Sequence, residues 1–352
     1  MMTLRQFSAG LDQIPMTVSW YLSDLGEARG KEELFTRQSP QRLKALREHA
    51  LIESAISSNR IEGVEVDRKR VGTIIFGKPI LQDRNEEELA GYRAALKWIH
   101  NQSGKIPLKT KSILELHRLA RGEIWDAGRF KEKDGDIIEK FPQGGSRIRF
   151  KTVPAKETPS AMRELISLWD QCQKERWAHP LLAIAGFNLD FLCIHPFRDG
   201  NGRVSRLLLL LQCYQLGYGV GRYISLERLI EQNKDRYYET LEQSSRGWHQ
   251  AKHDPWQYIN YLLFILKTAY QEFEDRLGKS PPVRGEKTEL VIRSIQQASE
   301  VFRIADLQRA CPGVSLDMIR KILKDLKARK QLECLGRGQN AAWKKTKIWR
   351  NR

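Results

Sequence analysis

Two apolar segments separated by a short polar run constrain the fold of this chain more than any other feature. Residues 180–194 are hydrophobic on nearly every side of the helix that they predict, so this helix has to be buried. Residues 207–211 are five consecutive leucines, which predict a second central helix. The sequence therefore predicts a mainly helical core, in which the polar run is a loop held on both sides by buried helices.

The polar run, residues 195–206, contains side chains that suit phosphate chemistry. It reads His-Pro-Phe-Arg-Asp-Gly-Asn-Gly-Arg-Val-Ser-Arg. His195 has an ordinary pKa of about 6.5 and can take up a proton near neutral pH. Pro196 disfavours the α conformation in the residue before it, so the preceding helix should end near His195. Asp199 offers a hard oxygen ligand for a metal ion.

The second half of the run predicts an anion site at the start of the next helix. Gly200, Asn201 and Gly202 allow a tight turn that brings bare backbone N–H groups toward an anion. Arg203 and Arg206 lie three residues apart and share one face of that helix. Each feature alone is typical of an ordinary turn or a solvated helix face. Together with a base and a metal ligand, they indicate a phosphate-transfer site.

The same run matches the signature of the Fic family at every defined position: His-Pro-Phe, one free residue, Asp or Glu, Gly-Asn-Gly-Arg, two free residues, Arg. The chain therefore resembles enzymes that transfer AMP from ATP to a Ser, Thr or Tyr hydroxyl of a protein, a reaction called AMPylation. The resemblance implies a Fic-type helical core, ATP as substrate, and Mg²⁺ or Mn²⁺ as the metal ion. In the related Doc group, which resembles a kinase, a Lys stands at the position of Gly202, so Gly202 favours AMP transfer over phosphate transfer.

The resemblance also implies a role for each residue of the signature. His195 would be the base for the target hydroxyl, and Asp199 would be the Mg²⁺ ligand. The rest of the signature would bind the nucleotide phosphates, the α and β phosphates by Gly200, Asn201 and Gly202, and the β and γ phosphates by Arg203 and Arg206.

A carboxylate in an unusual place precedes this site. Residues 41–62 have helical periodicity, and Gly63 follows as a C-terminal cap would. Glu62 would lie in the last helical turn, where the helix dipole favours a cation. Its surroundings resemble the inhibitory motif of Fic proteins: Ser or Thr (here Ser58), three free residues, Glu, then Gly or Asn. The resemblance implies that Glu62 pairs with Arg206 and blocks the γ-phosphate site; the alternative is a solvated helix former.

A β-hairpin is predicted between the helices. Residues 128–150 contain turn signals and end in an alternating segment that is typical of a strand. Fic proteins carry here a hairpin called the flap, which aligns the target side chain, so the resemblance implies Asp136, Ile137 and Ile138 as flap residues. A later helix at about 225–241 carries two tyrosines. The resemblance places Tyr237 near the adenine, although adjacent aromatic residues on a helix are also typical of core packing.

The end of the chain has a different character. Residues 278–285 have the composition of a linker, and from residue 279 onward there are 18 Lys and Arg against 7 Asp and Glu. Helices are predicted near 287–298, 303–310 and 315–329, followed by strand, turn and strand, an order that resembles a winged helix-turn-helix domain. The third helix and Arg337 in the wing would then contact DNA, and an interaction or dimerisation module is the alternative. The cations of the third helix and its tail are Arg320, Lys321, Lys324, Lys327, Arg329 and Lys330.

These patterns predict four parts of the chain. They are residues 1–105 with the inhibitory helix at about 41–63, a catalytic core at 106–277, the linker at 278–285 and a winged-helix-like domain at 286–352. The chain has no run of about 18 apolar residues and no secretory signal, and its five cysteines are scattered. We therefore expect a cytoplasmic protein that does not enter a membrane.

The expected partners are a target protein, which could be the chain itself, DNA bound through residues 286–352, and a second copy in a homodimer. Two other functions stay open. The same site could hydrolyse AMP from a modified protein, with Glu62 orienting the water molecule. Alternatively, the chain could be a DNA-binding regulator in which the Fic core senses nucleotide or is idle.

Overall fold

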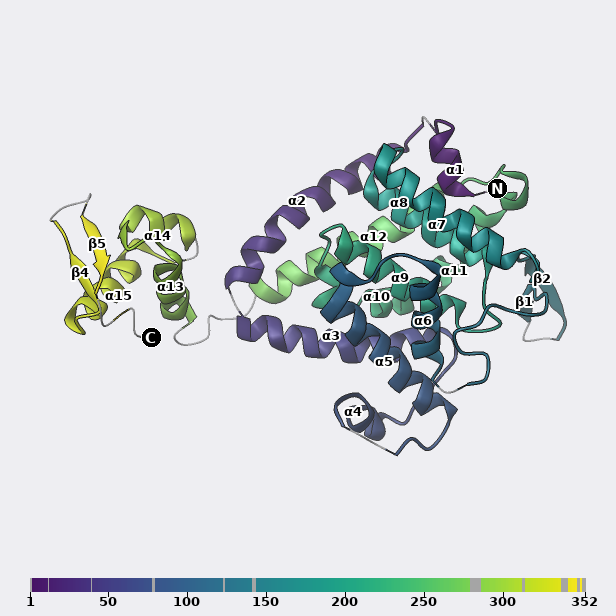
Figure 1. Cartoon of the computed structure of the whole chain (residues 1–352), viewed down its shortest axis with the longest axis horizontal. Helices are drawn as coiled ribbons and strands as arrows, with labels where there is room; N and C mark the ends of the chain where they lie inside the picture. Colours follow the sequence, from purple (N-terminus) through teal and green to yellow (C-terminus); the bar gives the residue numbers. More distant parts are fainter. Residues whose placement is uncertain are drawn as a thin grey trace. The chain divides into compact units, whose positions relative to one another are not determined.

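The computed structural model describes residues 2–11, 13–38, 40–77, 80–122, 124–140, 144–278, 286–311, 314–336, 341–346 and 349. They form two units, Met1–Leu277 and Gly278–Arg352. The mainly helical fold that the sequence predicts is confirmed (Figure 1). No helix in the described part of the chain is both long enough and apolar enough to cross a membrane.

The first unit contains helices throughout and one hairpin. Its elements in chain order are α1 (Thr3–Ser8), α2 (Met16–Gln38), α3 (Pro40–Ile61), α4 (Arg68–Phe76), α5 (Arg84–Gln102), η1 (Ser103–Lys105), α6 (Thr110–Arg121), β1 (Ile137–Lys140), β2 (Ser146–Phe150), α7 (Thr158–Glu175), α8 (Pro180–Ile194), α9 (Asn201–Gln215), η2 (Val220–Arg222), α10 (Leu226–Gln232), α11 (Lys234–Ser245), η3 (Trp248–Gln250) and α12 (Trp256–Gly278).

The two apolar segments form α8 and α9, which pack against each other at the centre of this unit. Every residue of α8 except Pro180 and Leu192 is buried, and all five consecutive leucines of α9 are buried. Helices α7, α1 and α11 cover α8, while α5 and α6 cover α9 (Figure 1). The polar loop at 195–200 is therefore fixed at both ends by helices that cannot move without exposing the core.

The start of the chain is bound to α8 through a buried carboxylate. Asp190 accepts hydrogen bonds from the Thr3 backbone N–H and hydroxyl at 2.8 Å each, and from the Leu4 N–H at 3.2 Å. It also accepts one from the Trp248 indole at 2.8 Å. The carboxylate thus satisfies N–H groups at the start of α1 that have no intrahelical partner. Burial raises the pKa of Asp190 to about 6.

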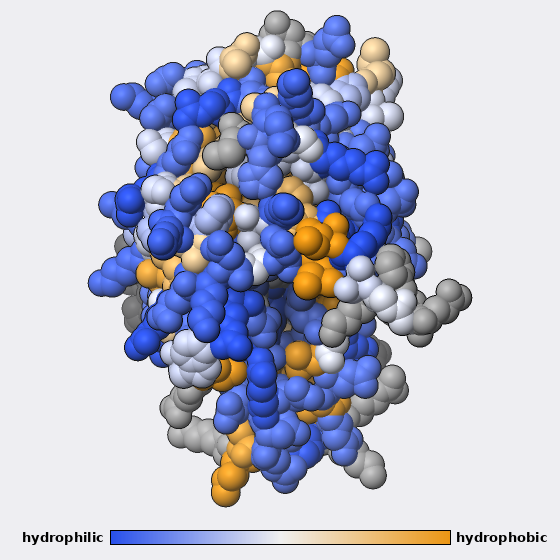
Figure 2. Space-filling view, turned by 90° about the vertical axis from the view of Figure 1, so that its right-hand side faces the viewer, coloured by the Kyte–Doolittle hydropathy of each residue, from blue (hydrophilic) through white to orange (hydrophobic). Residues whose placement is uncertain are grey.

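The predicted hairpin is present as β1 and β2, which pair antiparallel with an irregularity between Ile137 and Ile138. Gly144 and Gly145 both have a positive φ where the chain enters β2. The hairpin projects from one end of the first unit beside α11 (Figure 1), and Figure 2 views the molecule from that side. Ile138 and Ile148 pair across the two strands and are both more than half exposed.

One predicted helix differs in the structure. The segment at about 225–241, which the sequence predicts as one helix, is divided into α10 and α11. Asn233 separates them with φ −119° and ψ 33°, outside the α region. Its side chain donates to the Leu229 carbonyl at 2.9 Å and so takes the place of a backbone donor. Periodicity alone cannot show such a break, because the apolar spacing continues through it.

The second unit has its own core. Its elements are α13 (Glu286–Gln297), β3 (Val301–Arg303), α14 (Ile304–Ala310), α15 (Leu316–Ala328), β4 (Leu332–Cys334) and β5 (Ala342–Lys345). The strands form an antiparallel sheet in the order β3-β5-β4. The sequence predicted three helices and two strands but not β3, because three residues are too short to show an alternating pattern. The predicted linker from 279 and Arg337 in the predicted wing lie outside the described residues.

Candidate active site

The polar loop begins where α8 ends at Ile194. His195 has φ 53° and ψ 61°, so it leaves the right-handed helix at the residue before Pro196. Its N–H still donates to the Phe191 carbonyl at 2.9 Å. The loop ends at Gly200, whose φ of 82° is the left-handed region that glycine adopts without strain. Helix α9 then starts at Asn201 and directs its first N–H groups out of the helix end.

The His195 imidazole is arranged to act as a base. Its Nδ1 lies 3.3 Å from the Leu192 carbonyl oxygen. A carbonyl can only accept, so Nδ1 carries the hydrogen and Nε2 is left with a free lone pair. Burial, together with the nearby Lys131 ammonium, lowers the pKa of His195 to about 4. The side chain is therefore neutral and able to accept a proton at neutral pH.

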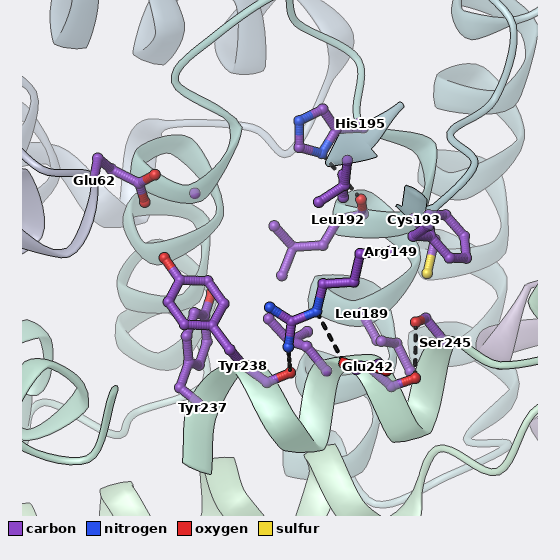
Figure 3. A pocket seen from close by; sticks show the side chains of 14 residues that line it. Glu62, Arg149, Leu189, Leu192, Cys193, His195, Tyr237, Tyr238, Glu242 and Ser245 are labelled. Atoms are coloured by element: carbon purple, nitrogen blue, oxygen red, sulfur yellow. Dashed lines mark hydrogen bonds and ion pairs between the residues drawn. The ribbon is translucent and has the colours of Figure 1, made fainter. Parts of the chain in front are cut away.

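His195 lines a cavity of about 260 Å³, called here the first cavity. Figure 3 shows Tyr237 and Tyr238 on one wall below Glu62, with His195 across from them. Tyr237 is buried and packs on Tyr258 and Tyr261. It therefore lines the first cavity and also belongs to the core beneath it. The sequence singled out Tyr237; the structure adds its neighbour Tyr238 to the wall. The cavity lining is Glu62, Ile137, Arg149, Phe150, Leu189, Leu192, Cys193, His195, Gly202, Tyr237, Tyr238, Leu241, Glu242 and Ser245.

Glu62 and Arg206 form the ion pair that the resemblance implies. Glu62 Oε1 lies 2.8 Å from Arg206 Nη2. Ser58 completes the contact, because its hydroxyl accepts from Arg206 Nε at 2.8 Å and its carbonyl accepts from Nη2 at 2.9 Å. Burial disfavours the charge on Arg206, but Glu62 raises the pKa of the guanidinium above its usual range. Any side chain at Gly202 would collide with the Glu62 carboxylate, so the glycine lets Glu62 approach α9.

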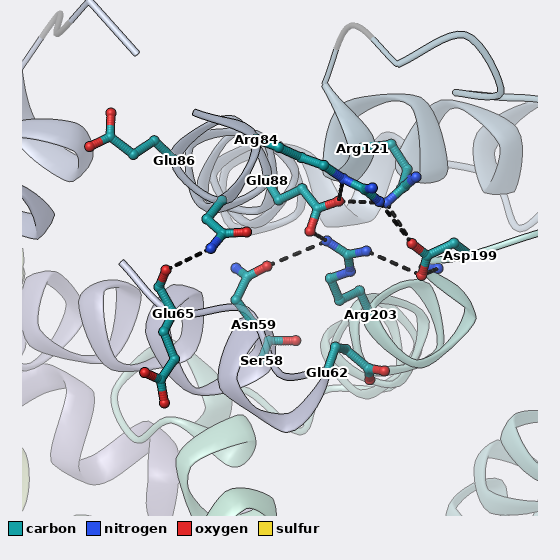
Figure 4. A network of polar contacts seen from close by, with 12 residues as sticks. Ser58, Asn59, Glu62, Glu65, Arg84, Glu86, Glu88, Arg121, Asp199 and Arg203 are labelled. Atoms are coloured by element: carbon teal, nitrogen blue, oxygen red, sulfur yellow. Dashed lines mark hydrogen bonds and ion pairs between the residues drawn. The ribbon is translucent and has the colours of Figure 1, made fainter. Parts of the chain in front are cut away.

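Asp199 belongs to a larger ionic network, shown in Figure 4. Its half-exposed carboxylate lies 2.9 Å from Arg121 and 3.1 Å from Arg84. Glu88, which is buried on α5, lies 2.5 Å from Arg121 and 2.7 Å from Arg203. Glu88, Arg84 and Arg121 were not predicted from the sequence as residues of the site. The available signal was a charged residue four positions before Tyr92 on the apolar face of α5.

The network also determines where Arg203 lies. Its guanidinium is 1% exposed and lies between Glu88 and, at 3.6 Å, Asp199. A weaker contact of 3.5 Å joins it to the Asn59 side chain of α3. Buried Glu88 thus holds Arg203 at the start of α9. Arg206 instead pairs with Glu62, which lines the first cavity.

Asn201 has a structural task in the loop. Its side chain accepts from the Phe197 N–H at 2.9 Å and donates to the Phe197 carbonyl at 2.8 Å. Only the backbone N–H of Asn201 is therefore directed out of the helix start. Phe197 in turn stacks on His117 with ring centroids 3.8 Å apart. His117 Nδ1 accepts from the Gly128 N–H, so its Nε2 carries the hydrogen and donates to the Asp199 carbonyl at 3.0 Å. This histidine therefore also holds the loop.

The three predicted flap residues lie in different surroundings. Ile137 lines the first cavity. Asp136 lines a second cavity of about 440 Å³, which contains residues from 125–136 together with Phe197 and Arg198. His195 lines both cavities, so it stands between them. Ile138 is exposed and is not among the residues that line the first cavity.

Asp199 is the residue through which a divalent cation could be held. Its carboxylate is accessible and lies beside the start of α9, where phosphate oxygens would complete the ligand set. One carboxylate with substrate phosphates is a usual set for Mg²⁺. In the part of the chain that the structure describes, no group of three or more His, Cys, Asp or Glu side chains could hold a metal ion. A cation at Asp199 would therefore depend on bound phosphate.

Comparisons with known proteins all identify similarity to Fic proteins. Residues 107–213 match the family model described as Fic/DOC family. Two proteins named protein adenylyltransferase Fic are similar to this chain: one from Culex quinquefasciatus is 25% identical over 214 residues, and one from Drosophila melanogaster is 24% identical over 211 residues. Both alignments cover 58% of this chain and 39% of the relative. The chain thus spans about two fifths of the length of these relatives.

Solved structures show the same fold. The chain is similar to a Fic family protein from Desulfovibrio desulfuricans G20, with a TM-score of 0.62 and 22% identity, covering 95% of this chain and 97% of the other. It is also similar to a Fic domain containing signaling protein from Bacteroides thetaiotaomicron VPI-5482, with a TM-score of 0.61 and 22% identity, covering 73% and 98%.

Proposed function

Because residues 107–213 belong to the Fic/DOC family, we propose that this chain is an adenylyltransferase that moves AMP from ATP to a Ser, Thr or Tyr hydroxyl of a protein. One observation carries the proposal. A neutral histidine with a free Nε2 stands beside the outward N–H groups of a helix start, at the edge of a cavity with an aromatic wall. A base, an anion site and room for a nucleoside that lie next to one another support this reaction.

The reaction starts with the target hydroxyl. Its oxygen attacks the α-phosphorus of ATP, while its proton passes to His195 Nε2. A new P–O bond to the protein forms as the bond to the pyrophosphate oxygen breaks, and the bond electrons leave with pyrophosphate. The pKa of about 4 keeps His195 unprotonated before the attack. General-base catalysis of this kind contributes roughly 10²–10⁴-fold in rate.

Charge neutralisation is the task of the remaining residues. The first N–H groups of α9 and the helix dipole suit the α and β phosphates. Arg206 is the cation for the γ phosphate once Glu62 no longer occupies it. A Mg²⁺ or Mn²⁺ ion, held by Asp199 and phosphate oxygens, would neutralise negative charge on the triphosphate. Arg84 is mostly exposed and pairs with the Asp199 oxygen that the buried Arg121 also contacts, so a cation would displace Arg84 and share the carboxylate with Arg121.

Glu62 acts as an internal inhibitor in this proposal. Its carboxylate lies on the Arg206 guanidinium and against Gly202, which is the space that the terminal phosphates need. A bound carboxylate there also repels the negative phosphates. ATP therefore binds in a productive way only when Glu62 moves away or is removed.

The proposal is tested by incubating four proteins with Mg²⁺ and ATP labelled at the α phosphate. They are the wild type, Glu62→Gly, Glu62→Gly/His195→Ala, and Glu65→Gly as a matched control. Glu65 is an exposed glutamate three residues further on, with no ion pair to Arg206. We expect at least about tenfold more label on protein in Glu62→Gly than in the wild type or the control, and none in the double variant.

The acceptors in this assay are the chain itself and the proteins of a cell lysate. Absence of label from all four proteins would contradict AMP transfer. A separate incubation of wild type with protein that Glu62→Gly has labelled tests the hydrolytic alternative. Release of labelled AMP that requires Glu62 would show that the same site also removes the modification.

A second candidate function belongs to the second unit, for which we propose binding of duplex DNA. The supporting observation is the surface of α15 and its tail. Ile319, Ile322, Leu323 and Leu326 turn into the core of this unit, and the six cations of the helix and its tail are all exposed. A helix that packs by one face and presents lysine and arginine on the other suits a phosphate backbone.

A further inference from the structure

Lys131 holds both peptide groups beside His195. Its backbone N–H donates to the Pro196 carbonyl at 2.9 Å. Its ammonium Nζ donates to the Ile194 carbonyl at 3.3 Å. The two acceptors are the residues directly before and after His195, so one lysine fixes the chain on each side of the base. Lys131 is 7% exposed, and the carbonyl of Ile194 is one of those that a helix end leaves without an intrahelical donor.

The same ammonium connects the loop to the base of the hairpin. Lys131 Nζ also donates to the Thr152 hydroxyl at 2.7 Å, and that hydroxyl donates to the Gly135 carbonyl at 2.6 Å. Gly135 lies two residues before β1, and Thr152 lies two residues after β2. The Thr152 hydroxyl therefore joins the two ends of the hairpin while it accepts from the lysine that holds His195. A hydroxyl can do both, since it has one hydrogen and free lone pairs.

We propose that Lys131 and Thr152 are positioning residues that couple the β1–β2 hairpin to His195, so that the hairpin and the base keep one fixed relative geometry during transfer to the target hydroxyl. The inference rests on the proposed adenylyltransferase function. Both residues act through His195 and through the hairpin backbone. Both are buried and neither lines the first cavity, whereas Lys131 lines the second cavity together with His195.

The coupling has an electrostatic side as well. The charged groups that face His195 are the Lys131 ammonium, Glu62 after α3 and Asp199 in the loop, while Arg149 and Glu242 line the same first cavity. The ammonium favours the neutral imidazole, whereas the two carboxylates favour the protonated one. Removal of the lysine therefore makes His195 easier to protonate as well as less well held.

The kinetic test uses the Glu62→Gly background, with α-labelled ATP and the acceptors named above. Lys131→Met and Thr152→Val remove the side-chain hydrogen bonds at nearly constant size and leave the backbone bond from Lys131 to Pro196 in place. Lys131→Arg and Thr152→Ser keep a donor or a hydroxyl at the same positions. Lys156→Met removes an exposed lysine of the same segment and is the control. We expect kcat to fall on the order of tenfold in the first two variants. The KM for ATP should stay within about twofold, because no nucleotide contact is removed.

A second readout does not depend on activity. Histidine-labelled protein of the full chain, followed by NMR and assigned with His195→Ala, reports the protonation of His195. At pH 5.5 we expect a neutral His195 in wild type, Lys131→Arg and Lys156→Met. In Lys131→Met the titration midpoint should rise by about one pH unit. A shifted midpoint at an unchanged thermal unfolding temperature would show that the Lys131 ammonium acts on His195 and not only on the stability of the fold.

The outcomes separate the inference from the function. If Glu62→Gly transfers AMP but Lys131→Met and Thr152→Val match Lys156→Met in kcat, the coupling is wrong. A rise in the KM for ATP that accounts for the whole loss would also overturn it, since the residues would then serve nucleotide binding. If Glu62→Gly transfers no AMP, the proposed function fails, and an unchanged His195 titration in Lys131→Met would independently overturn the positioning role.

Discussion

Glu88 shows how one buried side chain can organise a whole site. Its carboxylate forms ion pairs with Arg121 and Arg203, both less than 5% exposed, and with the mostly exposed Arg84. Arg121 reaches Asp199 in turn, so Glu88 determines the position of both the metal-ligand candidate and the first arginine of the signature. A buried cation without its counter-ion costs several kcal/mol. The arrangement of the polar loop therefore depends on a residue outside it.

We predict that Glu88→Gln lowers the free energy of unfolding of the first unit by about 3 kcal/mol, because two buried guanidinium groups lose a shared negative charge. Urea unfolding followed by circular dichroism measures this. Glu87→Gln is the matched control, because Glu87 lies next to Glu88 in the chain but is not the ion-pair partner of Arg121 or Arg203. We expect it to change the free energy of unfolding by no more than about 0.5 kcal/mol. Equal losses in the two variants would show that the network contributes nothing particular to stability.

Two helix ends meet at the contact between Glu62 and Arg206. Glu62 follows the last residue of α3, where the helix dipole disfavours a carboxylate. The carboxylate, however, lies against Gly202 in the first turn of α9, where the dipole favours an anion, and it binds Arg206 one turn further on. The unfavourable position in α3 is thus compensated by α9. Glu62 lies at the end of α9 that the proposal assigns to phosphate, which is the position that the proposed inhibition requires.

The exposed cations of α15 allow the proposed DNA binding of the second unit to be tested. Arg320 and Lys324 lie four residues apart on the exposed face. We expect Arg320→Glu/Lys324→Glu to weaken binding of a fluorescent 20-base-pair duplex by at least about tenfold. The slope of log K against log salt should fall by about two, as two phosphate contacts are lost. Anisotropy titrations at several salt concentrations measure both quantities.

The control for this prediction is Lys44→Glu/Lys97→Glu, which makes the same change of charge at exposed positions of the first unit. If both double variants lose affinity equally, the attraction comes from net charge alone. If the wild type does not bind the duplex, the second unit has another kind of partner and the DNA proposal is wrong.

At the scale of the whole molecule, ionisable groups are distributed unevenly. All seven histidines lie before residue 254, so the second unit contains none. In the first unit, burial lowers the pKa of His100, His117, His195 and His253 to about 4 each. Asp190 acts in the opposite sense, because burial raises its pKa to about 6. The two units should therefore respond differently to acid.

We predict that the first unit loses stability as the pH falls from 7.5 to 5.5. Between pH 6.5 and 4 the unfolded chain binds protons at four histidines that the folded chain keeps neutral, so stability rises with pH there. Asp190 binds its proton in the folded state, so its stabilising contribution is lost as the pH rises through about 6, and it offsets only part of the histidine effect. We expect a loss of at least about 1 kcal/mol at pH 5.5.

Hydrogen exchange in urea, resolved by peptide, measures this loss for each unit separately. The second unit is the internal reference, since it has no histidine to protonate. Equal changes in the two units, or no change in the first, would contradict the assignment of the buried histidines as neutral.

The sequence by itself determined the parts of this protein that depend on local order. The apolar run at 180–194, the proline after His195 and the glycine at 200 are neighbours in the chain, and they are sufficient to end one helix, turn the loop and start the next. The motif around Glu62 likewise predicted a contact with Arg206 that the structure contains. The hairpin was visible because turn residues and alternation are local signals.

Only the tertiary structure decided which distant groups would meet. Glu88, Arg121 and Lys131 come from segments far from residues 195–206. The local sequence marks Glu88 as a charge on an apolar helix face, but it does not show that any of the three faces the loop. The division of α10 from α11 and the strand β3 also depend on contacts made elsewhere in the fold. The physical reason is the same in each case: a buried charge or an unpaired strand is stable only when its partner is present, and the packing of whole helices decides which partner that is.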